Sequence, residues 1–436
     1  MRQNVERGKT ILIDGPACVA LYSGTLRAFG AQIKAGEHLI VRIGRRIPLE
    51  AIEDSQVEIL LGKSASCNII DEDPIPSSWK NAAEKILSSN GRVEVIVLGG
   101  IDSGKTSFCI YLANMALNSG RKVALIDGDL GQSDIGPPGT LGLSIIRKPF
   151  FDPFNLNPDH MIFIGVTSPY NVTERIIDGL VKLRSKALSM GSDFIIINTD
   201  GWIEGSDAID YKCRLIKNLE PKFTVIIWNN ESMKPMMDLL TNTGTKIEIL
   251  TVNVPKNIRK RDREMRKVIR ETLYKKYLKD GKVRSIPLSW IKINGNLEIK
   301  GKIDQALKKK VEEIVSNKLL YCENLQDNVI LVLKEGVSLS NEESARLATE
   351  LNKPIKIICE GDEKGLIVAL ENSEGEMLGI GIICNIDFER GTLKIYTNVE
   401  ETISGVHIGQ IRLNEKGNEI EIVGKSSKVP LKDITY

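Results

Sequence analysis

The sequence has little cysteine and little histidine. Its seven cysteines are scattered over 436 residues without a C-x-x-C pair, and its three histidines are far apart. Scattered cysteines argue against a disulfide framework and a structural zinc site, and they are typical of a reducing compartment. We therefore expect a cytoplasmic protein, and we expect no histidine-based metal site.

Long apolar runs are also missing. No run approaches the ~18 residues of a membrane-spanning helix, and residues 1–7 are polar, without an apolar signal core. We therefore expect no membrane partner. Apolar residues make up 42% of the chain and charged residues 27%, as in ordinary globular proteins, and the length of 436 residues predicts two or three domains.

The net charge of +2 conceals one basic segment. Between Pro255 and Ser285 there are thirteen Lys or Arg residues against four Asp or Glu residues. Such a concentration favours contact with a polyanion, although a charge run of this kind also occurs on helix faces that meet only water. Charge alone leaves both interpretations open.

One stretch carries a phosphate-binding motif, the P-loop. Residues 99–106 fit G-x-x-x-x-G-K-[ST], after an apolar β-branched run at 93–98 and before an apolar-periodic run at 107–118. This order predicts a strand, a loop and a helix, whose backbone N–H groups face phosphate oxygens. Lys105 would reach the β- and γ-phosphates of a nucleotide, and the Thr106 hydroxyl would bind Mg²⁺. The predicted nucleotide-binding residues are Gly99, Gly100, Ile101, Asp102, Ser103, Gly104, Lys105, Thr106 and Ser107.

Two carboxylates follow the next predicted strand, at 122–126. They are Asp127 and Asp129. Because ligands of an open parallel sheet bind beyond the carboxyl ends of its strands, we expect both carboxylates on the same rim as the P-loop. One carboxylate can bind Mg²⁺, and the other can accept a proton from an attacking hydroxyl group. An acidic turn without a catalytic role is the alternative.

Two more predicted strands, at 161–166 and 193–197, end in polar loops. The second of these loops contains Thr199, Gly201 and Trp202. A tryptophan in a glycine-flanked loop at the ligand rim can stack on a nucleobase, although a loop tryptophan is more often a packing residue.

The basic segment predicts a helix. Arg259, Arg263, Arg266 and Arg270 follow one another at steps of four, three and four residues, so we expect them on one helix face. An arginine face that folds over a P-loop would neutralise charge on a transferring phosphoryl group. A helix face that meets only water needs no such alignment.

The predicted fold class is α/β, with three domains. Residues 1–74 contain short β-prone runs separated by glycines, and they predict an N-terminal β domain without a catalytic cluster. Residues 75–283 alternate strand and helix, and they predict a central P-loop domain with a mostly parallel sheet and an arginine-rich lid. Residues 284–436 predict a C-terminal β-rich domain with one helix at 341–352.

Together these motifs resemble one family, the polynucleotide 5′-hydroxyl kinases, which include the eukaryotic pre-mRNA cleavage-factor and pre-rRNA-processing kinases and their archaeal counterparts. Four matches occur in the family's order: the P-loop, D-x-G-Q at 129–132, T-x-G-W at 199–202 and the arginine-rich lid. The resemblance implies transfer of the γ-phosphoryl group of ATP, with Mg²⁺, to the 5′-hydroxyl of RNA or DNA. It implies RNA or DNA 5′ ends and other RNA-processing proteins as partners.

The resemblance also implies roles, carried over position by position. Lys105 is the phosphate lysine, Thr106 a Mg²⁺ ligand and Asp129 the residue that activates the 5′-hydroxyl group. Asp127 matches a position that accepts Asp or Glu, which implies a supporting role in catalysis and at the metal. The residues that would hold the 5′ end are Gln132, Thr199, Gly201 and Trp202, and the catalytic lid arginines would come from Arg263, Arg266 and Arg270.

Two other functions are compatible with the P-loop. A nucleotide-bound scaffold or GTPase-like switch in an RNA-processing assembly would use the same loop, but no N-K-x-D guanine-reading tetrad follows a strand. A small-molecule kinase would use it too, but it would leave the basic helix and the tryptophan unexplained.

Overall fold

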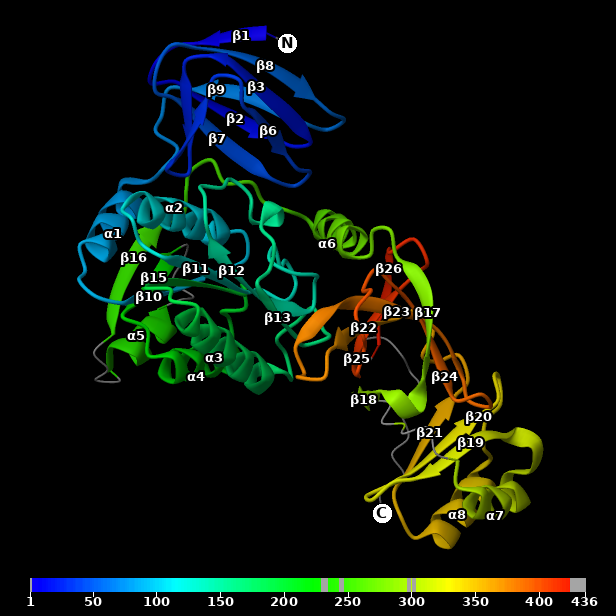
Figure 1. The fold of residues 1–436 in the computed structure, drawn as a ribbon. Helices are drawn as coiled ribbons and strands as arrows, with labels where there is room; N and C mark the ends of the chain where they lie inside the picture. The colour runs from blue at the N-terminus through cyan, green and yellow to red at the C-terminus, as the bar shows by residue number, and fades with distance from the viewer. Residues whose placement is uncertain (1, 229–233, 243–246, 296–298, 300–302, 424–436) are drawn as a thin grey trace. The chain divides into compact units, whose positions relative to one another are not determined.

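The computed structural model describes residues 2–228, 234–242, 247–295, 299 and 303–423. The chain divides into two compact units, Met1–Leu273 and Tyr274–Tyr436 (Figure 1). The division falls inside helix α6 (Arg263–Tyr277). The three domains expected from the sequence, with boundaries at 74/75 and 283/284, stay a prediction.

The first part of unit 1 is all β, as predicted. It consists of two antiparallel sheets, with the strand orders β1-β8-β3-β6 and β5-β4-β7-β2-β9. Buried and more exposed residues alternate along β3, as expected for a strand with one face in a core. The strands are β1 (Arg2–Val5), β2 (Thr10–Asp14), β3 (Ala17–Ser23), β4 (Thr25–Ala28), β5 (Ala31–Lys34), β6 (His38–Val41), β7 (Arg46–Ala51), β8 (Ser55–Leu61) and β9 (Ser66–Ile70).

The second part of unit 1 is a seven-stranded sheet in the order β13-β12-β11-β14-β10-β15-β16. Neighbours from β11 to β16 in that order are parallel, whereas β12 is antiparallel to both β11 and β13. The predicted mostly parallel sheet is confirmed, although the sequence-based prediction lacks β12. The elements are α1 (Ser77–Leu87), β10 (Val93–Gly99), α2 (Lys105–Asn118), β11 (Val123–Gly128), β12 (Thr140–Ile146), β13 (His160–Phe163), α3 (Thr173–Ser189), β14 (Phe194–Thr199), α4 (Ser206–Leu219), β15 (Phe223–Trp228), α5 (Lys234–Asn242) and β16 (Glu248–Asn253).

Strand β10 divides its apolar side chains between the two faces of this sheet. Val93 and Val95 join α1 and α2 in one core, and Ile96 and Leu98 join α3 to α5 in another. Figure 1 shows α1 and α2 on one side of the sheet and α3 to α5 on the other. The strand before the P-loop is therefore buried on both faces, which fixes the position of the loop.

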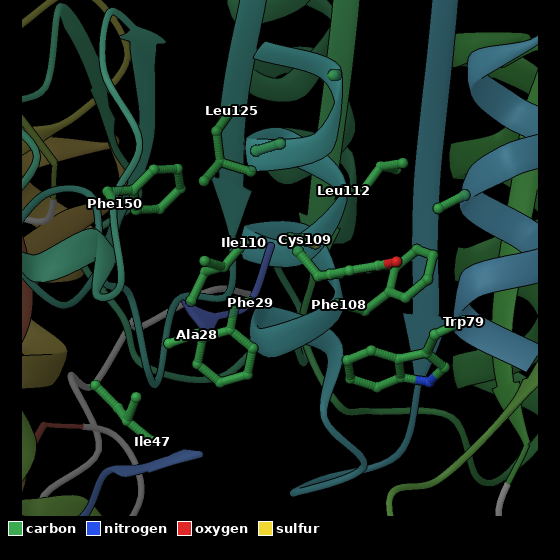
Figure 2. Close-up of a cluster of buried hydrophobic side chains, with 14 of the residues drawn as sticks. Ala28, Phe29, Ile47, Trp79, Phe108, Cys109, Ile110, Leu112, Leu125 and Phe150 are labelled. Carbon is green, nitrogen blue, oxygen red and sulfur yellow. The ribbon is translucent and has the colours of Figure 1, made fainter. Parts of the chain in front are cut away.

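The core on the α1–α2 side continues into the N-terminal strands. Phe29 and Ile47 belong to the same buried cluster as Trp79, and Figure 2 shows Phe29 and Trp79 beside helix α2. Asn114 of α2 is fully buried, and its Nδ2 donates hydrogen bonds to the carbonyl oxygens of Phe29 (2.9 Å) and Phe150 (2.8 Å). The N-terminal β part is thus fixed directly to the helix that follows the P-loop.

Unit 2 is β-rich, as predicted. Its larger sheet has the order β17-β24-β23-β22-β25-β18, with β26 paired to β25, and its smaller sheet has the order β19-β20-β21. Helices α7 and α8 share a buried core with the smaller sheet. The elements are β17 (Lys282–Pro287), β18 (Lys292–Asn294), α7 (Gln305–Val315), β19 (Leu319–Asn324), β20 (Val329–Leu333), α8 (Asn341–Leu351), β21 (Ile355–Cys359), β22 (Leu366–Glu371), β23 (Met377–Asp387), β24 (Thr392–Thr397), β25 (Gly405–Leu413) and β26 (Glu419–Ile422). Among the residues that the structure describes, no helix combines the length and apolar character of a membrane span.

Candidate active site

The P-loop joins β10 to α2 in the predicted order of strand, loop and helix. Asp102 and Gly104 have positive φ angles of 53° and 102°, and Gly104 is the N-cap of α2. A Cβ atom on Gly99 would lie 2.6 Å from Ser103 Oγ, so any larger residue there would force the Ser103 side chain to move. The loop therefore has the tight backbone of a phosphate-binding turn, with a helix N-terminus directly after it.

Lys105 is buried at the start of α2. Its Nζ donates hydrogen bonds to the carbonyl oxygens of Gly99 (2.9 Å) and Gly100 (2.8 Å). Burial lowers the pKa of Lys105, while the carboxylates of Asp129 and Asp200 act in the opposite direction. A poorly solvated cation beside a phosphate-binding turn is well suited to interact with a polyphosphate.

Asp127 holds the D-x-G-Q loop together. Its Oδ2 accepts a hydrogen bond from the backbone N–H of Asp134 (2.7 Å), and its Oδ1 accepts from Asn198 Nδ2 (3.1 Å) and from the N–H of Asp129 (3.2 Å). Burial, followed by the charges of Asp134 and Asp129, raises the pKa of Asp127 to about 7. Asp127 and Thr106 line the same small cavity beside α2. Because both Asp127 oxygens already accept hydrogen bonds from the protein, the geometry favours a supporting role.

Asp129 is oriented by the loop that follows it. Its Oδ1 accepts hydrogen bonds from the backbone N–H groups of Gly131 (3.1 Å) and Gln132 (3.0 Å). Burial raises the pKa of Asp129, and the ammonium group of Lys105 acts against this rise. A carboxylate of fixed orientation near the phosphate lysine is what general-base chemistry at this rim requires.

Buried polar contacts fix the T-x-G-W loop. Lys212 of α4 is fully buried, and its Nζ lies 2.7 Å from Asp200 Oδ2. The backbone N–H of Trp202 donates to Asp200 Oδ1 (2.9 Å). The Thr199 hydroxyl donates to the carbonyl oxygen of Val97 (2.8 Å), across the sheet. Asp200 and Lys212 are thus the supports of this loop, and the sequence analysis missed both.

The predicted residues for the 5′ end lie on two loops beside the P-loop. A Cβ atom on Gly201 would lie 2.9 Å from the backbone nitrogen of Ile101, so the T-x-G-W loop touches the P-loop. Gln132 donates from Nε2 to the carbonyl oxygen of Gly131 (2.7 Å). Its Oε1 is buried and has no hydrogen-bond partner within the described part of the chain. That oxygen is available to a donor on a bound molecule.

Arginines of the lid segment bind the P-loop. Arg266 Nη2 donates to Asp102 Oδ2 at 3.0 Å, and the backbone N–H of Arg261 donates to the same oxygen at 3.0 Å. Burial, followed by the charge of Arg45, lowers the pKa of Arg261 to about 10. The sequence analysis included Arg266 among the lid residues and missed Arg261.

The prediction that four arginines share one helix face is wrong for Arg259. The carboxylate of Asp262 accepts a hydrogen bond from a backbone N–H of the first helical turn (2.7 Å), and α6 begins at Arg263. Arg259 therefore precedes the helix, and it forms an ion pair with Asp14 at 3.6 Å. Arg263 is exposed at the helix start, whereas Arg270 is half-buried.

A basic turn of the N-terminal strands, residues 42–46, reaches the D-x-G-Q loop. Arg42 donates to Asp134 (3.2 Å) and to both carboxylate oxygens of Asp152 (2.6 and 2.7 Å), and Arg45 pairs with Asp134. Burial disfavours the charge of Arg45, but the two carboxylates outweigh it and raise the pKa of Arg45 above its ordinary value. The basic turn therefore anchors the loop that carries Asp129.

The basic turn also holds the segment before α6. Arg46 Nη1 donates to the carbonyl oxygen of Asn257 (2.9 Å), and Arg261 Nε donates to the carbonyl oxygen of Gly44 (3.0 Å). The sequence analysis missed these contacts. The only sequence feature that could have indicated them is the group of arginines around Gly44. The turn at residues 42–46 thus positions the site from outside the seven-stranded sheet.

The chain is similar in sequence and fold to several known proteins. Residues 99–280 match a family model described as the mRNA cleavage and polyadenylation factor CLP1 P-loop. The chain is similar to a polyribonucleotide 5′-hydroxyl-kinase of Methanocaldococcus jannaschii, with 31% identity over 81% of this chain and 96% of that protein. A second such kinase, of Pyrococcus furiosus, is 27% identical over 81% of this chain and 97% of that protein. A solved Clp1p–Pcf11p complex contains a chain of similar fold, with TM-score 0.66 and 13% identity over 94% of this chain and 97% of that chain.

The fold and the strand–loop–helix motif define a P-loop nucleotide-binding protein. Within that class, the chain belongs to the polyribonucleotide 5′-hydroxyl-kinase family, because its match to the Methanocaldococcus jannaschii protein extends over nearly all of that relative. The family resemblance read from the sequence motifs is thereby confirmed.

Proposed function

We propose that this chain is an ATP-dependent polynucleotide 5′-hydroxyl kinase, which transfers the γ-phosphoryl group of ATP to the 5′-hydroxyl of RNA, DNA or both. The observation that carries the proposal is the placement of the Asp129 carboxylate, which has a fixed orientation near the phosphate lysine Lys105. Membership of the kinase family supports the same reaction.

On the donor side, ATP binds to residues 99–107. The Lys105 ammonium group neutralises charge on the β- and γ-phosphates. Mg²⁺, when bound, supplies further neutralisation of the phosphates. The Thr106 hydroxyl and the Asp127 carboxylate would hold it, and these two residues line one small cavity beside α2. Hydroxyl and carboxylate oxygens are ligands that suit this cation.

On the acceptor side, Asp129 accepts the proton of the 5′-hydroxyl group. The hydroxyl oxygen forms a bond to the γ-phosphorus while the bond from that phosphorus to the β-phosphate oxygen breaks, so ADP leaves. Gln132 and Trp202 would contact the nucleic acid. Thr199 and Gly201 would act through the shape of their loop, because the Thr199 hydroxyl is bonded to Val97 and Gly201 permits contact with the P-loop.

The lid arginines would stabilise charge on the transferring group. Arg263, Arg266 and Arg270 remain the candidates from the sequence, and we add Arg261. Arg266 and Arg261 are the better placed, because the Arg266 guanidinium group donates to Asp102 Oδ2 (3.0 Å) and Arg261 Nη1 lies 3.9 Å from Asp102 Oδ1.

The proposal is tested by transfer of label from γ-labelled ATP to an oligonucleotide with a 5′-hydroxyl end, with RNA and DNA of one sequence in parallel. We expect transfer to the 5′-hydroxyl oligonucleotide and none to its 5′-phosphorylated counterpart. ATP retention without transfer would overturn the proposal in favour of a nucleotide-bound scaffold. A cytoplasmic location and RNA-processing partners belong to the same proposal; cell fractionation tests the location, and copurification from cell extract tests the partners.

A further inference from the structure

The carboxylate of Asp102 is bonded to the lid segment. Its Oδ2 accepts hydrogen bonds from Arg266 Nη2 and from the backbone N–H of Arg261, both at 3.0 Å, and its Oδ1 lies 3.9 Å from Arg261 Nη1. Only 10% of the Asp102 side chain is exposed. A carboxylate has no hydrogen to donate and repels a phosphate oxygen, so this side chain is unsuited to bind a phosphate directly. The backbone of Asp102 thus belongs to the P-loop, and its side chain belongs to the lid contact.

Arg266 retains a hydrogen-bond donor at this contact. Its Nη2 meets two acceptors, Asp102 Oδ2 and the carbonyl oxygen of Arg261 (2.7 Å). Its Nε is buried and has no hydrogen-bond partner among the residues that the structure describes. A buried donor without an acceptor is costly, and a phosphate oxygen is an acceptor that a guanidinium group binds strongly. The contact with Asp102 therefore holds the guanidinium group in place and leaves a donor for the nucleotide.

Arg266 also lies between the P-loop and the D-x-G-Q loop. Gln132 Nε2 donates to the carbonyl oxygen of Arg266 (3.4 Å), and Gln132 follows Asp129 in the D-x-G-Q loop. Asp102 contacts the same arginine from the P-loop. The γ-phosphoryl group moves from a nucleotide on the P-loop toward an acceptor activated by Asp129, so charge develops between the two loops. An arginine stabilises that charge only when its position is fixed before the transfer.

We propose that the Asp102 carboxylate is a positioning residue for phosphoryl transfer, which holds Arg266 and Arg261 of the lid over the P-loop. This role rests on the proposed kinase function. Long arginine side chains lose less freedom on meeting the phosphates when a buried carboxylate has already restrained them. Asp102 acts through the arginines, and its side chain leaves the nucleotide to the other groups of the loop. Loss of this carboxylate should therefore lower kcat without weakening the binding of ATP, because a negative charge beside the polyphosphate disappears.

The experiment replaces Asp102 in the full chain with glycine and with asparagine. The φ angle of Asp102 is 53°, and both replacements accept this left-handed conformation, so neither strains the loop. For Asp102→Gly we expect kcat to fall on the order of 10²-fold, as misplacement of a catalytic group by about 1 Å does, with the Kd for ATP unchanged or lower. Asp102→Asn keeps one acceptor oxygen and should lose less. Glu264→Gln, which removes an exposed carboxylate from the first turn of α6, is the matched control.

A double-mutant cycle with Arg266→Ala shows whether Asp102 acts through the arginine. In the Arg266→Ala background, Asp102→Gly should cost much less kcat than it does in the wild-type background, because the group that it positions is already gone. Losses that multiply in full would overturn the positioning role. A higher Kd for ATP in Asp102→Gly, with kcat unchanged, would assign the carboxylate to nucleotide binding and would overturn it as well.

Hydrogen exchange without nucleotide keeps the lid contact separate from catalysis. The backbone N–H of Arg261 donates to Asp102, so its exchange should accelerate in Asp102→Gly and stay unchanged in Glu264→Gln. Unchanged exchange in Asp102→Gly would overturn the contact itself. If the wild-type chain transfers no phosphoryl group and the exchange still accelerates, the kinase function fails and the lid contact stands. If transfer occurs and Asp102→Gly keeps the wild-type kcat, the positioning role fails alone.

Discussion

Arg266 of helix α6 donates a hydrogen bond from Nη2 to Oδ2 of Asp102 in the P-loop, at a distance of 3.0 Å. A charge-assisted hydrogen bond of this kind restrains both of its partners. The backbone N–H of Arg261 donates to the same oxygen, so two positions of the lid segment are tied to the loop that receives the nucleotide phosphates. Substitutions in the lid should therefore alter phosphoryl transfer rather than stability alone.

We expect Arg266→Ala to lower kcat by ~10³ or more if its guanidinium group meets the transferring phosphoryl group, the scale seen for arginine fingers. If the arginines only collect nucleic acid, the acceptor KM should rise and its salt dependence should flatten by about one phosphate contact. The same measurements rank the other arginines, with the variants Arg261→Ala, Arg263→Ala and Arg270→Ala. Lys267→Ala, an exposed cation on the same helix, is the control. Unchanged kcat and KM in every arginine variant would reject both roles.

Lys105→Ala should abolish phosphoryl transfer and leave the fold intact. The lysine makes its polar contacts to carbonyl oxygens of its own loop, and it is outside the apolar clusters formed by the described residues. Label transfer and thermal unfolding, measured on one preparation, check the two halves of this expectation. Near-normal turnover by a folded variant would remove the P-loop assignment.

Two variants, Asp129→Asn and Asp127→Asn, should distinguish a catalytic role from a structural one. We expect Asp129→Asn to lower kcat on the order of 10²-fold or more, as loss of a general base does, with ATP still bound. Asp127→Asn should instead destabilise the fold by about 1–3 kcal/mol, because an amide cannot accept from all the donors that now point at Asp127. Chemical denaturation and steady-state kinetics report the two effects. A larger kcat loss in a fully stable Asp127→Asn chain would reverse the roles.

As the pH is lowered, the rate of phosphoryl transfer should begin to fall at a higher pH than it would if the base were an aspartate with an ordinary pKa. Asp129 acts as a base only when ionised, and burial raises its pKa above the ordinary value. The carboxylate is therefore protonated, and the base lost, as pH falls through this raised pKa. The profile of kcat/KM against pH measures the midpoint, with circular dichroism at each pH as the control for unfolding. A profile flat down to about pH 4, where ordinary aspartates ionise, would contradict Asp129 as the base.

Arg45→Met should lower both stability and kcat, although Arg45 lies outside the seven-stranded sheet that carries the P-loop. It leaves Asp134 and Asp152 short of a partner in a largely buried site, and breaking such a pair costs on the order of 3 kcal/mol. Because Asp134 follows Gln132 in the D-x-G-Q loop, the acceptor carboxylate should shift as well. Arg27→Met removes an exposed ion pair of the same strands with Glu50 and should cost about 0–1 kcal/mol. An equal effect of the two variants would argue against a positioning role.

The sequence was sufficient for features that depend on neighbours in the chain. The P-loop, the D-x-G-Q loop and the T-x-G-W loop each follow a strand, and their glycines occupy positions where the backbone is tight. The helix start at Arg263 was also readable, since Asp262 is a good capping residue, and attention to it would have excluded Arg259 from the helix face.

Contacts between distant segments of the chain could not be predicted from the sequence. Nothing near Arg42 or Arg45 indicates that they will meet Asp134, about ninety positions further along. The ion pair between Lys212 and Asp200 places an α4 lysine under the T-x-G-W loop, and a helix lysine is usually solvated. Such contacts depend on how sheets and helices pack, which periodicity does not encode.

Asn114 determines how this protein can be divided. Its buried amide donates to Phe29 in the N-terminal strands, and the core around it contains side chains from both parts. A fragment that begins at residue 75 would keep the acceptor on Phe150, but it would lose the acceptor on Phe29 and leave the apolar side of α2 in water. Such a fragment would aggregate when expressed. The smallest portion that can be produced in isolation with an intact kinase site therefore includes the N-terminal strands.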